Sequence, residues 1–197
     1  MIFGGIGKSL NQAIKQSVSA GCLRLSDGIP LETYGNQALV DKQSYRDAMA
    51  RLAAAVNIIT TAGPGGKRGF TASAVCSVTD TPPTLLVCLN RNSDSNQALK
   101  DNGILCVNTL AAGHEGLSPI FAGMTGVEGE DRFNHGNWST LTTGAAVLDD
   151  ALVSFDCRVA QTVEVGTHTV FICEVDAVHS NQDRGLLYFG RAYHTIG

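Results

Sequence analysis

Apolar positions along this chain fall into short runs that turn residues separate from one another. β-Branched side chains between Gly, Pro, Asn or Asp are typical of strands, whereas a helix needs a longer run with a period near 3.6 residues. Strand-like runs occupy 54–61, 68–78, 84–90, 104–110, 151–163, 168–178 and 186–189. These seven runs at short spacing favour a closed antiparallel barrel over alternating β/α units.

The two longest runs predict a hairpin. Residues 165–167 form its turn, which places His168 at the start of the second strand. Residues 63–66, with three glycines and a proline, predict another hairpin turn before the strand 68–78. We interpret 68–78 as the central strand of the fold.

That central strand is unusual because nearly all of its side chains are small. Such a strand lets a flat ligand approach its backbone, but it is equally typical of a strand beneath a tightly packed neighbour. Residues 79–83 then predict a tight turn, because they combine hydroxyl and carboxylate side chains with two prolines. We expect Val78 to pair with Thr84 across it.

Three segments have helical features. The segment 44–55 begins at Ser44, which can cap it, and Asp47 follows three residues later. A second helix begins after Ser93 or Ser95 and ends before Gly103. A capped helix start beside Arg91 can bind an anion, although a plain cap on a solvated helix explains the same residues. A short helix is expected at 115–121.

Residues 1–40 differ from the rest and predict an N-terminal arm, mobile or docked on a partner, ahead of a domain at 41–197. The first 26 residues contain no Asp or Glu, which faintly resembles a transit peptide. Residues 8–19 could form one amphipathic helix. The Gly-rich start at 4–9 is not a phosphate-binding P-loop, because the required first Gly is Ile2.

Composition and the absence of common motifs argue against several classes of function. A net charge of −4 argues against nucleic acid, and no apolar run approaches the roughly 20 residues that cross a membrane. The six cysteines match no zinc spacing, so we expect no metal and interpret them as reduced thiols of a cytoplasmic protein. Hydrolase, metalloprotease and Rossmann motifs do not occur. Hydroxyls, small residues and a capped helix remain, and these suit a flat, anionic, aromatic ligand.

Several motifs in order resemble the short-chain flavin reductases, the small components of two-component flavin-dependent monooxygenases, which serve oxidations such as that of 4-hydroxyphenylacetate and pyrimidine utilisation. The resemblance spans about Ser44 to the C-terminus. It is carried by 55–61, 69–85, 105–108, 121–125, 165–168 and 191–194. It implies a split β-barrel that dimerises, with flavin bound near the dimer interface.

The resemblance also implies roles for particular residues. The isoalloxazine and ribityl chain would lie along 71–74, with Ser77 near the polar edge of the flavin, and the phosphate side would match the segment 90–96. His168 would face the nicotinamide as a positioning hydrogen-bond donor, although it could simply bond its own turn. The implied flavin-binding residues are Thr71, Ala72, Ser73, Ala74, Ser77, Asn90, Arg91, Ser93 and Asn96, and the implied NADH-binding residues are His168, Arg191, Tyr193 and His194.

The expected activity is reduction of exchangeable FAD or FMN by NADH or NADPH, with the reduced flavin passed to a large oxygenase. The hydride chemistry belongs to the cofactor, and the protein positions it. Two alternatives stay open: a split-barrel protein that binds flavin or haem without turnover, and a flavin oxidase that keeps its cofactor.

Overall fold

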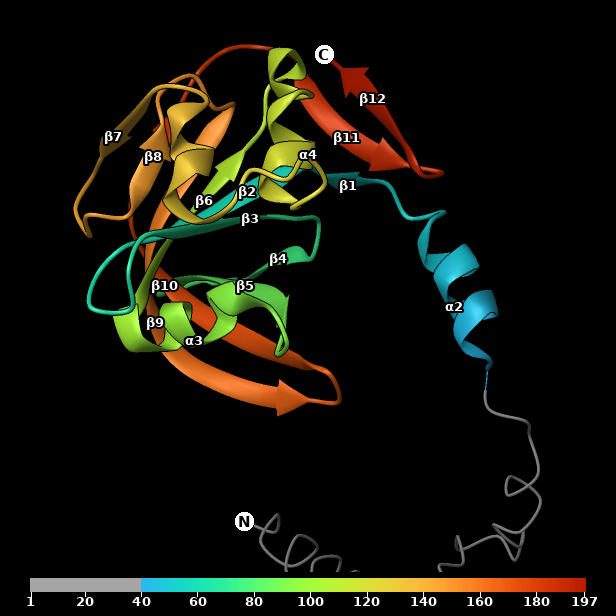
Figure 1. Cartoon of the computed structure of the whole chain (residues 1–197), viewed down its shortest axis with the longest axis horizontal. Coiled ribbons are helices and arrows are strands. Elements are labelled where there is room, and N and C mark those ends of the chain that lie inside the picture. The colour runs from blue at the N-terminus through green and yellow to red at the C-terminus, as the bar shows by residue number, and fades with distance from the viewer. Residues whose placement is uncertain (1–39) are drawn as a thin grey trace, which may run out of the picture. The chain divides into compact units, whose positions relative to one another are not determined.

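A computed structural model describes residues 40–197, and residues 47–197 form one compact unit (Figure 1). The expectations for the N-terminal arm, the helix at 8–19 and Cys22 lie outside the described residues, apart from Val40. The structure is mainly β, as predicted. Its strands are β1 (Ala54–Ala55), β2 (Asn57–Thr61), β3 (Arg68–Ala72), β4 (Val75–Asp80), β5 (Pro83–Asn90), β6 (Ile104–Thr109), β7 (Trp138–Thr140), β8 (Ala146–Leu148), β9 (Val153–Val165), β10 (His168–Ser180), β11 (Gly185–Phe189) and β12 (Ala192–Ile196).

Short helices connect the strands. They are α2 (Lys42–Met49), α3 (Asp94–Asn102), η2 (Ala112–His114), α4 (Leu117–Phe121) and η3 (Gly129–Asn134). The prediction for α3 is confirmed, since Ser93 caps it through the amide of Ser95 and Gly103 ends it with a positive φ of 67°. The prediction for 44–55 is wrong at both ends. Asp41, rather than Ser44, accepts the first amides of α2, and the chain is already a strand at Ala54.

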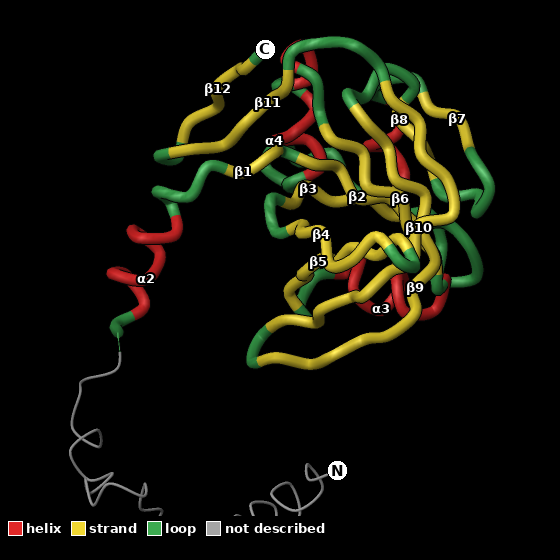
Figure 2. The backbone as a smooth tube through the Cα atoms, turned by 180° about the vertical axis from the view of Figure 1, so that it is seen from behind, coloured by secondary structure: helices red, strands yellow, loops and turns green. Residues whose placement is uncertain are grey.

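Seven antiparallel strands form the main sheet in the order β3-β2-β6-β9-β10-β5-β4. The two edge strands, β3 and β4, follow each other in the chain and are joined only by Ser73 and Ala74. The sheet must therefore curl until its edges approach each other (Figures 1 and 2). In the described part of the chain no ladder pairs β3 with β4, so the barrel is split as the resemblance implied and is not closed as the strand spacing predicted.

The expected central strand 68–78 is consequently wrong. Its two halves lie at opposite edges of the sheet, because the chain turns at Ser73. The register across the next turn also differs, since Thr79 pairs with Thr84 and Ser77 pairs with Leu85. Val78 lies in the bulge between them, and a bulge cannot be read from alternation alone.

A second sheet covers one end of the barrel. It has the order β1-β11-β12, and Val56 links it to the main sheet: its amide donates to Leu186 O at 3.1 Å, and its carbonyl accepts the amide of Leu110 at 2.9 Å. The predicted hairpins are confirmed, including the start of β10 at His168. Strands β7, β8 and β12 were not predicted.

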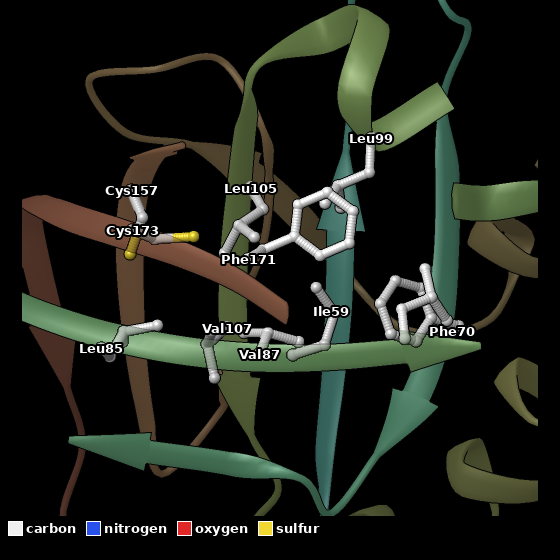
Figure 3. Close-up of a cluster of buried hydrophobic side chains, with 11 residues drawn as sticks. Ile59, Phe70, Leu85, Val87, Leu99, Leu105, Val107, Cys157, Phe171 and Cys173 are labelled. Carbon is white, nitrogen blue, oxygen red and sulfur yellow. The ribbon is translucent and has the colours of Figure 1, made fainter. Parts of the chain in front are cut away.

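Buried side chains from both halves of the curled sheet meet inside the barrel. Figure 3 shows Phe171 of β10 and Leu99 of α3 pointing toward each other, with Ile59 and Val87 beside them. Burial raises the pKa of the Cys173 thiol to about 12, which makes it an unreactive core group at neutral pH. The described cysteines are all free.

Candidate functional site

Two surface pockets adjoin each other beside β3, and we call them the two ends of one groove. The α3 end lies beside the start of α3 and is lined by Phe70, Thr71, Leu89, Asn92, Ser93, Asp94, Ser95, Phe121, Ala122 and Arg132. The hairpin end lies beside β11 and β12 and is lined by Val56, Thr71, Ala72, Ser73, Ser118, Ala122, Met124, Tyr188, Arg191 and Tyr193. The two ends adjoin, because Thr71 and Ala122 line both.

Small residues of β3 let the neighbouring helix approach this strand. An added Cβ at Gly69 would lie 2.6 Å from Cε1 of Phe121, so only glycine admits the Phe121 ring there. One turn earlier in α4, Ser118 accepts a 2.7 Å hydrogen bond from the Thr71 hydroxyl through its carbonyl. The small side chains of β3, predicted to admit a flat ligand, thus allow α4 to pack closely against β3. The groove lies beside this contact.

The hairpin end is aromatic and held by hydrogen bonds. The Tyr193 hydroxyl donates to Ser118 Oγ at 2.8 Å, and the Tyr188 and Tyr193 rings meet edge to face at 5.3 Å. Arg191 lies in the two-residue turn between β11 and β12 with a φ of 67°, and its guanidinium pairs with Asp47. A residue with a Cβ is strained at a positive φ, so the backbone conformation does not explain why an arginine occupies this position.

The α3 end is polar and carries one cation. Ser93 and Ser95 lie at the start of α3, where the positive end of the helix dipole favours an anion, although the amide of Ser95 already donates to Ser93 Oγ. Arg132 of η3 lies across from them, with Nη1 donating to Gly69 O at 3.1 Å. The Asp94 carboxylate is exposed at the same end. This arrangement suits a phosphate, whereas the hairpin end suits an aromatic ring.

The structure brings only some of the predicted residues into this groove. Thr71, Ala72, Ser73, Arg191 and Tyr193 line its hairpin end, and Ser93 lines its α3 end. Ala74 follows the turn that leaves β3, and Ser77 is exposed on β4 at the other sheet edge.

The remaining residues of the predicted phosphate segment have other partners. Asn90 Oδ1 accepts the amide of Asn92 at 2.9 Å and shapes the turn before α3. Arg91 is exposed, with Nε 3.7 Å from Glu164. Asn96 is buried, and its Nδ2 donates to Thr169 Oγ1 at 3.1 Å. None of the three lines the groove.

The two predicted histidines lie apart. His168 is exposed at the tip of the β9–β10 hairpin, opposite Asn90, with Nδ1 2.9 Å from the Thr167 hydroxyl. It therefore lies near the α3 end and not with Arg191 and Tyr193. His194 contacts Phe189 O through Nε2 at 3.2 Å, on the strand face opposite Tyr193.

Sequence reasoning missed several lining residues. Arg132, Ser118 and Met124 come from connections between strands, where no periodicity marks a function. Tyr188 was recoverable, because it precedes the recognised turn of the last hairpin. The described residues contain no group of three His, Cys, Asp or Glu side chains that could hold a metal. No helix among them is long and apolar enough to cross a membrane.

Comparison with known proteins identifies the family. The flavin reductase like domain matches residues 49–197, which is most of the chain. A protein of Ancylobacter novellus named FMN reductase (NADH) RutF is 59% identical over 158 residues, covering 80% of this chain and 86% of its own.

Comparison with solved structures indicates the same family. A Haemophilus somnus protein described as a flavin reductase is 48% identical with a TM-score of 0.76, covering 80% of this chain and all (100%) of its own. A homologue of nitrilotriacetate monooxygenase component B from Mycobacterium thermoresistibile is 27% identical with a TM-score of 0.72, covering 80% and 87%. The chain therefore belongs to the flavin reductase family of oxidoreductases.

Proposed function

We propose that this protein uses NADH to reduce free flavin, FMN or FAD, and supplies the reduced flavin to a separate monooxygenase of aromatic or heterocyclic degradation. The observation that carries the proposal is the pair of adjoining pockets over β3, one polar and cationic and the other aromatic, which share Thr71 and Ala122. A flavin nucleotide has the same two parts. The names of the similar proteins, FMN reductase (NADH) and a monooxygenase component, support this assignment.

The protein residues bind and orient the reactants in this proposal. The bound flavin supplies the hydride-accepting ring. The ring would rest at the hairpin end, which Ala72, Ser73, Tyr188 and Tyr193 line. Much of the rate then comes from holding nicotinamide and flavin in a fixed stack, which removes the entropy cost of their encounter.

His168 remains a proposed NADH-positioning residue, and its place near Asn90 makes the test informative. His168→Ala should raise the KM for NADH more than the KM for flavin, because the proposed hydrogen bond is made to the dinucleotide and not to the flavin. We would measure both constants from steady-state NADH oxidation. Equal changes in the two constants, or none, would contradict the assignment.

Both ends of the groove lie at the protein surface, which supports transfer of reduced flavin to a large oxygenase. Its lining residues offer hydrogen bonds and contacts and no covalent attachment of the cofactor. A cytoplasmic location belongs to this proposal as well, since free thiols and pyridine nucleotides are typical of that compartment.

A homodimer is also part of the proposal, and the outer face of the main sheet supports it. Ile172 of β10 lies beside Leu86 of β5, and Val170 lies between Cys88 and Val163. These neighbours alternate with the buried core residues and therefore point outward, where they are exposed or half-buried. Ile172→Glu should shift the protein to monomer in sedimentation velocity, whereas Glu174→Gln on the same strand should not.

Purified protein mixed with NADH and free FMN or FAD tests the activity. We expect loss of absorbance at 340 nm that depends on the added flavin and continues over many turnovers. Flavin that co-purifies tightly without NADH consumption would contradict the proposal and support a flavin-retaining oxidase or a binding protein.

A further inference from the structure

Among the described residues, main-chain oxygens alone hold the Arg132 side chain at the α3 end of the groove. Its Nε donates to Val127 O at 3.1 Å, and its Nη1 donates to Gly69 O at 3.1 Å and to Phe121 O at 3.4 Å. The residue is half-buried. These bonds fix the guanidinium in place but do not neutralise its charge.

Other arginines near the groove are neutralised differently. Arg91 has Glu164 3.7 Å away, and Arg191 at the hairpin end pairs with Asp47. Within the described residues, no ion pair joins Arg132 to a carboxylate. A half-buried cation without a counter-charge is unfavourable, so an anionic ligand at this position would be stabilised strongly.

We propose that Arg132 is the cation that binds the phosphate of the flavin nucleotide and makes the enzyme select FMN or FAD over riboflavin. This inference rests on the proposed function. It places the phosphate between the Arg132 guanidinium and the start of α3, where Ser93 and Ser95 lie. The resemblance implied Arg91 for the phosphate side, but in the structure Arg91 forms an ion pair with Glu164 of the β9–β10 hairpin.

The exposed Asp94 carboxylate provides a second, independent test of the proposed phosphate position. It lines the α3 end together with Arg132 and belongs to the first turn of α3. A phosphate bound there experiences repulsion from Asp94 and attraction from Arg132. Removing each charge must therefore change phosphate affinity in opposite directions.

The test compares the dissociation constants of FMN and riboflavin, measured by quenching of flavin fluorescence. Arg132→Gln should weaken FMN binding by about tenfold or more, since a hydrogen bond to a charged group is worth about 1.5–3 kcal/mol. Riboflavin binding should change by less than about twofold, because riboflavin has no phosphate. Arg91→Gln should leave the ratio of the two constants within about twofold of the wild type.

Asp94→Asn removes an exposed charge without touching the bonds that Arg132 makes, so it serves even if Arg132→Gln fails to fold. It should tighten FMN binding about two- to fivefold at low salt and leave riboflavin unchanged. An unchanged FMN constant in Asp94→Asn, or an equal loss of both flavins in Arg132→Gln, would overturn the inference. A wild-type protein that binds neither flavin would instead contradict the proposed function.

Discussion

The two ends of the groove differ in what holds them together. The hairpin end depends on side-chain contacts between distant segments, since Tyr193 reaches Ser118 and Arg191 reaches Asp47. The α3 end depends on the main chain, since a helix start and the carbonyls around Arg132 shape it. Loss of a single side-chain hydroxyl should therefore change the hairpin end. Only a substitution that changes a charge or the packing should change the α3 end.

Phe121 lines the α3 end and is buried beneath it, and its loss should have the largest effect. The ring is 1% exposed, packs on Gly69 and meets Phe133 at 5.4 Å. Phe121→Ala should lower the free energy of unfolding by about 3–5 kcal/mol in urea titration, because it leaves a cavity. Met124→Ala, at a lining residue that is 77% exposed, should cost less than about 0.5 kcal/mol. Equal costs would contradict the packing role of the buried Phe121 ring.

Tyr193→Phe should affect the hairpin end alone. It removes the 2.8 Å bond to Ser118 and should cost about 0.5–1.5 kcal/mol of stability. We expect a several-fold higher KM for NADH with an unchanged ratio of FMN to riboflavin affinity. Tyr188→Phe, a matched loss of a hydroxyl at the same end, should change the KM less. A changed flavin ratio would show that the ends are coupled.

Arg191→Asn should separate stability from function at the strained turn. Asparagine tolerates the positive φ of 67° better than arginine, so stability should stay the same or rise by up to about 1 kcal/mol. The KM for NADH should rise several-fold if the guanidinium binds the dinucleotide. A less stable variant with unchanged kinetics would assign Arg191 to structure, through its pair with Asp47.

The smallest expected effect is a dependence of stability on acid at the hairpin tip beside the α3 end. The pKa of Glu164 is lowered from 4.5, first by its hydrogen bond from Lys100 and also by one from Thr169. A lowered pKa means that this stabilisation is present above pH 4.5 and is lost as the pH falls through the folded value. Thermal melts should show a weaker decline below pH 4.5 in Glu164→Gln than in wild type. Parallel declines would contradict this role.

The sequence predicted local elements better than their arrangement. The cap at Ser93 and the start of β10 depend on neighbouring residues, and both predictions are confirmed. The run 68–78 has one composition throughout, so nothing in it indicated that its halves form opposite edges of the sheet. That separation arises from the closing geometry of seven strands.

The candidate site was partly predictable for the same reason. Thr71 to Ser73 stood out by size, and resemblance indicated Arg191 and Tyr193. Arg132 could not be found, because a lone arginine in an irregular segment is ordinarily a solvated surface residue. Only the folded chain places it beside the start of α3.

A crystal structure of the full chain with FMN tests the central claim most directly. We predict the phosphate at the start of α3 within hydrogen-bond reach of Arg132, and the ring over Thr71, Ala72 and Ser73. A flavin bound along β4 beside Ser77, or one whose phosphate contacts Arg91 while Arg132 stays unengaged, would contradict the account.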